Sequence, residues 1–226
     1  LTLSKLIEFT GGYEDSAYPF GGFLVNQKAL EINQNAKEKL YNKFLNNLIE
    51  KSQSSAEDSG LGLVLQQLQD APVTGRVMAE FDLDVIKTNS NLDTILEQGD
   101  EILIPNITQQ VYVQGEVSNQ GAIRYLPGQS LDYYIENSGG ILTSADAQTI
   151  FVVHPNGETQ NISVNTNSRL SFILNKNNSI LIYPGSIIYV PKSADITSGA
   201  EIASIWAPII SSVALSLTSL SVLSNN

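Results

Sequence analysis

Two segments of the chain share one pattern of apolar, polar and glycine positions. Residues 2–17 align without gaps with residues 130–145, at a constant offset of 128. In both segments a Thr or Ser precedes apolar residues four apart, and a Gly-Gly pair follows. This spacing predicts a short helix with an N-cap residue at its start and left-handed glycines at its end. We therefore expect two copies of one unit.

Both copies continue in the same way. Short apolar runs typical of strands follow the helices at 23–25 and 150–153, and matched pieces close the copies at 99–105 and 185–191. The second copy alternates over 110–117 like a half-buried strand. A hairpin turn at 119–121 and a return strand at 122–126 follow. The second copy is completed by two strands at 150–154 and 159–164, a turn between them at 155–158, and a closing strand at 187–190. The fold class that this order predicts is α+β, with the helix on one sheet face.

The first copy carries extra residues. Gly12 and Gly99 are 87 residues apart, whereas Gly140 and Gly185 are 45 apart. Apolar residues at spacings of 3 to 4 over 28–51 and 61–68 predict a helical hairpin inserted at about 27–71. Two interpretations stay open, a hairpin at a subunit or domain contact and a hairpin that only decorates the surface.

The C-terminal segment is poor in ionic groups. Residues 202–223 contain no Lys, Arg, Asp, Glu or His, and 22 residues reach roughly 33 Å as a helix, close to the thickness of a bilayer core. One helix face is apolar and the other serine-rich, so we expect an amphipathic transmembrane helix in a ring of copies around water. The residues expected to face the membrane are Ile202, Ile205, Trp206, Ile209, Val213, Leu217 and Leu220, and those expected to face the lumen are Ser204, Ser212, Ser216 and Ser219.

Three parts follow from these patterns. We expect a first unit at 1–105 that is incomplete at its N-terminus, a second unit at 106–192 and a membrane helix at 193–226. The first residue is not Met, and no basic start with a long apolar run follows it, so we expect a fragment without a signal peptide.

Charge and composition narrow the function. The formal charge is −11, from 12 Lys and Arg against 23 Asp and Glu, which argues against nucleic acid as a partner. The chain has no Cys and one His, which removes thiolate chemistry and makes metal hydrolysis improbable. We expect neither a metal nor a cofactor.

Several residues could carry chemistry. The carboxylates of Asp82, Asp84, Asp100 and Glu101 could pair for glycoside hydrolysis, but we favour a structural role because Asp100 follows a glycine in a turn that both copies share. His154 precedes a Pro-Asn-Gly turn and is predicted to be a surface residue.

Three further residues are candidates for contact with a glycan. They are Tyr133, Tyr134 and Arg124. The two tyrosines are neighbours on the predicted helix and face different ways, so one of them must lie near the surface. The alternatives are packing of the tyrosines on the sheet and a surface ion pair for the arginine.

The second copy carries the motifs of a known family. The stretch Val-Tyr-Val-Gln-Gly-Glu-Val at 111–117, Leu-Pro-Gly-Gln-Ser-Leu at 126–131 and Ser-Gly-Gly at 138–140 with Ala145 resemble the soluble-ligand-binding β-grasp (SLBB) domain. Two such units before an apolar C-terminal segment resemble the C-terminal half of outer-membrane polysaccharide export proteins. The helical insertion is more similar to the group-2 capsule exporters.

The resemblance also has limits. Gln120 stands where the family usually has Pro, the first unit lacks the initial hairpin, and the N-terminal polysaccharide-export domain is absent. The β-grasp motif alone specifies a fold better than a function.

The resemblance implies a subunit without enzymatic activity. It would belong to a homo-oligomeric outer-membrane channel, with a large periplasmic portion, that exports capsular polysaccharide or exopolysaccharide. An inner-membrane co-polymerase and an ABC transporter are the partners that it implies. The alternative is a soluble periplasmic carbohydrate-binding module that docks on a partner through its C-terminal helix.

Overall fold

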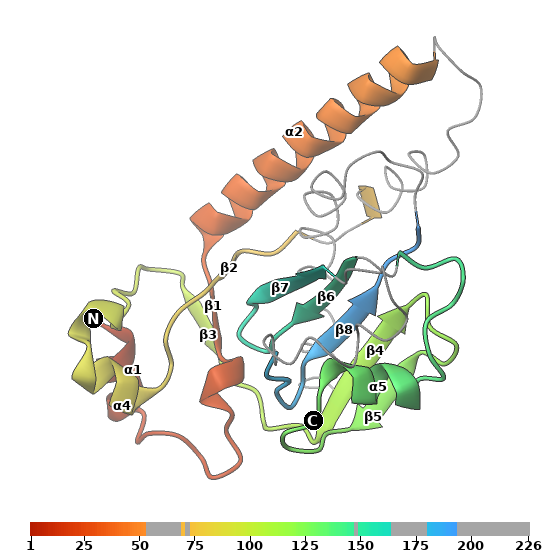
Figure 1. The fold of residues 1–226 in the computed structure, drawn as a ribbon. Helices are drawn as coiled ribbons and strands as arrows, with labels where there is room; N and C mark the ends of the chain where they lie inside the picture. Colours follow the sequence, from red (N-terminus) through yellow and green to blue (C-terminus); the bar gives the residue numbers. More distant parts are fainter. Residues whose placement is uncertain (53–68, 71–72, 147–148, 164–179, 194–226) are drawn as a thin grey trace.

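The described part of the chain folds into two β-sheets with helices against them (Figure 1). The structure is a computed structural model, and it describes residues 1–52, 69–70, 73–146, 149–163 and 180–193. Among these residues the first sheet has three strands in the order β2-β1-β3, and the second has five in the order β5-β4-β8-β6-β7. The expected α+β class is confirmed to the extent that these residues combine helices with sheets.

The first sheet is small and antiparallel, with β1 in its centre. Helices α1 and α4 lie on the same side of it in the view of Figure 1. Leu3 and Ile7 of α1 pack on Phe81, and all three side chains are buried. The elements are α1 (Leu3–Phe9), η1 (Pro19–Gly21), β1 (Phe23–Val25), α2 (Gln27–Ser52), β2 (Arg76–Val77), α4 (Leu83–Thr88), η2 (Ser90–Leu92) and β3 (Glu101–Leu103).

The second sheet is larger, and α5 covers one of its faces (Figure 1). Strands β4 and β8 are parallel, and the other neighbours are antiparallel. The predicted strand, strand, helix, strand, strand order and the closing strand are confirmed. The elements are β4 (Gln110–Gly115), β5 (Gly121–Arg124), α5 (Leu131–Asn137), β6 (Thr149–Val153), β7 (Thr159–Ser163) and β8 (Ile187–Val190).

Hydrogen bonds and backbone angles confirm that the two copies correspond. The Gly-Gly pairs at 11–12 and 139–140 all have φ between +80° and +97°, as the left-handed helix end requires. The amide of Tyr18 donates to the carbonyl of Pro105 at 2.7 Å, and the amide of Asp146 donates to the carbonyl of Pro191 at 2.8 Å. These two bonds occupy equivalent positions in the aligned copies.

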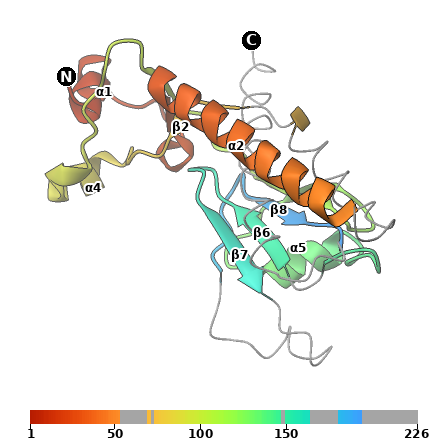
Figure 2. The same ribbon diagram turned by 90° about the horizontal axis from the view of Figure 1, so that it is seen from above.

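The insertion replaces a turn. In the second copy the residues at 154–158 connect β6 to β7, and in the first copy the residues at 26–75 connect β1 to β2. The predicted first helix of the hairpin is confirmed as α2, which leaves the first sheet and runs above the second (Figure 1 and Figure 2). The predicted second helix at 61–68 lies outside the described residues.

Within the part of the chain that the structure describes, no helix combines the length and apolar character needed to cross a bilayer. The predicted membrane helix, with all its membrane-facing and lumen-facing residues, lies outside that part, because 194–226 are not described. It remains a prediction.

Candidate functional site at the junction of the two sheets

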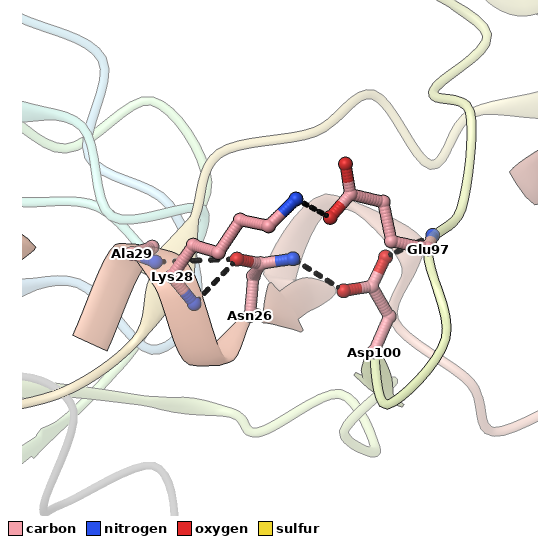
Figure 3. Close-up of polar contacts among 5 residues, drawn as sticks. All are labelled: Asn26, Lys28, Ala29, Glu97 and Asp100. Atoms are coloured by element: carbon pink, nitrogen blue, oxygen red, sulfur yellow. Dashed lines mark hydrogen bonds and ion pairs between the residues drawn. The ribbon is translucent and has the colours of Figure 1, made fainter. Parts of the chain in front are cut away.

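The base of α2 is tied to the turn before β3 (Figure 3). Asn26 caps the helix, because its Oδ1 accepts hydrogen bonds from the amides of Lys28 and Ala29 at 2.9 and 3.2 Å. Its Nδ2 donates to Oδ1 of Asp100 at 2.6 Å, and the other oxygen of that carboxylate accepts from the amide of Glu97 at 2.8 Å. One amide side chain therefore fixes the start of α2 against the first sheet.

The end of the insertion meets its beginning. The amide of Asn26 donates to the carbonyl of Gly75 at 2.8 Å. A Cβ atom at Gly75 would lie 2.4 Å from the carbonyl oxygen of Asn26, so the two chain segments approach too closely for any larger residue. Both ends of the insertion are therefore held at one point.

Arg76 follows directly and reaches the second copy. Its Nη2 donates to the carbonyl of Pro155, in the turn between β6 and β7, and its guanidinium lies 4.5 Å from the ring centroid of Phe23. Gly157, with φ +91°, lies against it, since a Cβ there would be 3.2 Å from Nε. Burial lowers the pKa of Arg76 to about 10, which leaves the side chain charged at neutral pH.

An aromatic row crosses the same junction. Phe20 of η1 lies 4.5 Å from the ring centroid of Tyr183, which precedes β8, and 5.9 Å from that of Tyr18. Burial raises the pKa of Tyr18, and Tyr125 and Tyr183 act in the same direction. Rings from both copies thus pack against one another.

His154 lies behind this row, and its prediction as a surface residue is wrong. Its side chain is 2% exposed, its ring meets Tyr183 edge-on at 5.1 Å, and its Nδ1 lies 3.3 Å from Oγ of Ser186. Burial lowers its pKa, while Glu158 and Gln160 act in the opposite direction. The Pro-Asn-Gly turn after it suggested exposure, but packing of the loop before β8 buries it.

The predicted glycan contacts do not come together. Tyr134 is fully buried. Its hydroxyl accepts a hydrogen bond from the amide of Leu126 and donates one to the carbonyl of Leu126, both at 3.2 Å. Tyr133 is half-buried, which agrees with the expectation that one of the pair lies near the surface. Arg124 is exposed, but its neighbour Ile123 packs into the core under α5, so alternation places Arg124 on the other sheet face.

Two of the four candidate carboxylates, Asp82 and Asp100, accept hydrogen bonds that fix local structure. Asp82 caps α4 by accepting hydrogen bonds from the amides of Asp84 and Val85 at 2.9 and 3.3 Å. Asp100 fixes the base of α2, as described above. These contacts support the structural role that the sequence favoured over catalysis.

Comparison with known proteins identifies the family. A family model described as "Capsule biosynthesis GfcC, N-terminal" matches residues 2–104, and one described as "Capsule biosynthesis GfcC C-terminal" matches residues 119–214. The chain belongs to the GfcC capsule biosynthesis family. The predicted relationship to capsule export proteins is confirmed. The junction described above joins the two parts of this GfcC-family chain that the two models match.

Two relatives from Escherichia coli are similar over part of their length. The polysialic acid transport protein KpsD is 32% identical over 119 residues, which is 50% of this chain and 21% of KpsD. The uncharacterized protein YjbG of strain K12 is 29% identical over 138 residues, which is 61% of this chain and 53% of YjbG. The chain therefore spans about a fifth and about half of the lengths of these relatives.

We predict that the cap of α2 stabilises this GfcC-family chain. Asn26→Ala removes the N-cap and the bond to Asp100, so the free energy of unfolding should fall by about 1 kcal/mol in urea titrations. Lys28→Ala is the matched control. The ion pair between Lys28 and Glu97 is 2.6 Å long, but its side chains are 73% and 53% exposed, and its loss should have no measurable effect. Equal losses in the two variants would contradict the prediction.

A second prediction concerns the arginine at the junction. Arg76→Ala removes a charged hydrogen bond and the contact with Phe23, and should lower the free energy of unfolding by about 2 to 3 kcal/mol. Arg124→Ala, at an exposed arginine of the second sheet, should change it by less than about 0.5 kcal/mol. The measurement is urea unfolding of both variants, and similar stabilities would show that the junction is not held by Arg76.

The third prediction is a pH dependence. Because the pKa of His154 is lowered in the folded chain, the unfolded chain binds a proton first as the pH falls below about 6.5. The stability associated with the neutral side chain is therefore complete above that pH and is lost below it, with a slope of at most about 1.4 kcal/mol per pH unit.

The comparison that checks it is between the natural chain and His154→Gln from pH 8 to pH 5. The two unfolding free energies should run parallel above pH 7 and diverge below pH 6.5, with the natural chain losing more. His154 is the one histidine in the sequence, so its proton NMR titration is free of overlap. Parallel curves over the whole range would contradict the prediction that His154 causes the loss of stability at low pH.

Proposed function

We propose that the chain is a non-catalytic subunit of the apparatus that exports capsular polysaccharide. The observation that carries this proposal is the match of both halves to one capsule biosynthesis family, together with the similarity to a protein named for polysialic acid transport. The structural roles of Asp82 and Asp100 support a subunit without glycan-cleaving activity.

The more specific form of the proposal is a ring of identical subunits in the outer membrane with a large periplasmic portion. Residues 202–223 would supply one helix per subunit, with the serine stripe toward water and the Ile and Leu face toward lipid. An uncharged, hydroxyl-lined lumen would let an anionic polymer pass without binding tightly. Energy would come from an inner-membrane co-polymerase and an ABC transporter, as the family resemblance implies.

The alternative is a soluble periplasmic module that binds carbohydrate and docks on a partner. Tyr133 and Arg124 remain proposed glycan contacts, but they lie on different sides of the second sheet and would contact different parts of a polymer. Tyr134 has no exposed surface for such a contact. This arrangement favours weak contacts along a passing chain over one closed binding site.

A paired substitution tests the channel. Ile209→Lys with Val213→Lys places two charges on the proposed lipid face. Each lysine raises the free energy of membrane insertion by roughly 2.5 to 3.5 kcal/mol near the bilayer centre, so the pair should abolish detergent-dependent membrane association. Ser212→Lys with Ser216→Lys is the matched pair on the proposed lumen face. It should leave membrane association intact and reduce surface capsule in a producing strain.

The measurements are the membrane fraction extracted by detergent and the amount of capsule at the cell surface. Equal effects of the two lysine pairs on membrane association would contradict the proposal of a ring with a serine-lined lumen. If deletion of residues 200–226 left the protein as water-soluble and monomeric as before, the soluble module would be the better description.

A further inference from the structure

Positive charge in this chain is concentrated on α2. The helix has 26 residues and contains five of the 12 Lys and Arg, but only three of the 23 Asp and Glu. The rest of the chain therefore holds seven basic and 20 acidic residues, a formal charge of −13, whereas α2 has a charge of +2. An anionic ligand is repelled by the body of the chain and attracted to this helix.

One face of α2 is used inside the chain. The side-chain amide of Asn33 donates to the carbonyl of Thr74 at 2.8 Å, and Nζ of Lys37 donates to the carbonyl of Gln69 at 2.8 Å. Both acceptors belong to the returning end of the insertion. This face of the helix therefore points at the chain's own backbone, and the opposite face is left for other contacts.

The opposite face carries lysine and asparagine side chains in a stripe. Successive residues of a helix are turned by about 100°, which places these side chains within roughly 60° of the direction opposite Lys37. All of them are exposed. We call this set the basic stripe, and it consists of Asn35, Lys39, Asn42, Lys43 and Asn46.

The two lysines of the basic stripe have no carboxylate beside them. In a helix, a side chain meets its neighbours three and four residues away. For Lys39 and Lys43 these neighbours are asparagines, an alanine, a leucine and the other lysine, although the helix also contains three glutamates. Neither lysine takes part in an ion pair among the described residues. Two like charges one turn apart repel each other, and a bound anion would remove this repulsion.

We propose that the basic stripe binds the carboxylate groups of an acidic polysaccharide. This inference rests on the proposed function and adds to it the chemical class of the polymer. An ammonium group pairs with a sugar carboxylate, and an asparagine amide both donates to and accepts from sugar hydroxyls. From Asn35 to Asn46 the stripe extends about 17 Å along the helix axis, so a linear polymer can lie along it.

A polysaccharide fits the basic stripe better than a protein partner does. Protein interfaces are depleted in lysine at their centre and enriched in aromatic residues, whereas the stripe consists of lysine and asparagine alone. The stripe also lies on a fixed element, because Asn26 ties the base of α2 to Asp100 and Gly75. A binding surface on a fixed helix needs little ordering when the polymer arrives.

Lys39→Gln with Lys43→Gln tests the proposal in the 226-residue chain. The probe is an oligogalacturonate, which carries a carboxylate on every sugar, and calorimetric titration measures its affinity. The double variant should bind it about tenfold more weakly, and its affinity should depend less on salt than that of the natural chain. Lys39→Arg with Lys43→Arg should keep the natural affinity, because both charges remain.

The matched control removes two lysines from outside the basic stripe. Lys28→Gln with Lys87→Gln makes the same change in net charge, and these side chains are 73% and 67% exposed and paired with Glu97 and Asp84. Their loss should leave the affinity within about twofold of the natural value. The control ligand is the methyl ester of the same oligogalacturonate. It lacks the negative charges and should bind the natural chain about tenfold more weakly than the acid does.

Four results would overturn the proposal. They are absence of binding by the natural chain at low salt, unchanged affinity in Lys39→Gln with Lys43→Gln, an equal loss in the control pair, and equal affinities for the acid and its ester. Binding to vesicles that contain phosphatidylglycerol, with the same need for the two lysines and no binding of the oligogalacturonate, would identify a membrane surface as the ligand instead.

The binding tests and the test of the export role have separate readouts. The amount of surface capsule reports on export, and the calorimetric affinity reports on the basic stripe. If Ser212→Lys with Ser216→Lys reduced surface capsule while the natural chain failed to bind the oligogalacturonate, the export role would stand and the stripe would have no part in it.

Discussion

The fold depends on one antiparallel pairing, between the strand that follows each helix and the strand that closes each copy. In both copies this pairing has the same register. It brings residues about 80 positions apart in the first copy, and about 40 apart in the second, into one ladder. A one-residue slip would turn every core side chain of the strand toward solvent, so the register is strongly specified. The helix, its Gly-Gly end and the bond to the last proline are all arranged around this ladder.

The same pairing explains why one copy can carry a long insertion. The turn that follows this strand, between β1 and β2 in the first copy and between β6 and β7 in the second, lies outside the ladder, and it can be short or long without changing the core. Closing a longer flexible loop costs little extra free energy, since the cost grows only with the logarithm of its length. The first copy limits even this cost, because the bond between Asn26 and Gly75 brings the ends of the insertion together.

Much of the fold was predictable from local patterns. Alternation and turn residues gave the strands, and apolar spacing with Gly-Gly gave α1 and α5. The position of His154 was not predictable in this way, since its burial depends on Tyr183 and Ser186, which are remote in sequence. The roles of Tyr133 and Tyr134 could not be assigned either, because adjacent helix positions differ by about 100° and the sequence does not say which one faces the sheet.

Arg76 was missed for a similar reason. It lies in a strand of only two residues, and no sequence motif includes it. Its partners Pro155 and Gly157 belong to the other copy, in a turn whose pattern is fully explained by the hairpin it forms. Only the packing of the two sheets shows that this turn also accepts a half-buried cation.

The location of Arg76 connects the insertion to the junction. Gly75 is the last residue held against the base of α2, and the next residue reaches across to the second copy. No flexible linker separates the two contacts. A displacement of α2 relative to the first sheet would therefore act on the guanidinium, and through it on the β6–β7 turn. Because a half-buried charge that loses its partner is destabilising, the two copies and α2 are held in one arrangement. This coupling fixes the orientation of one unit relative to the other.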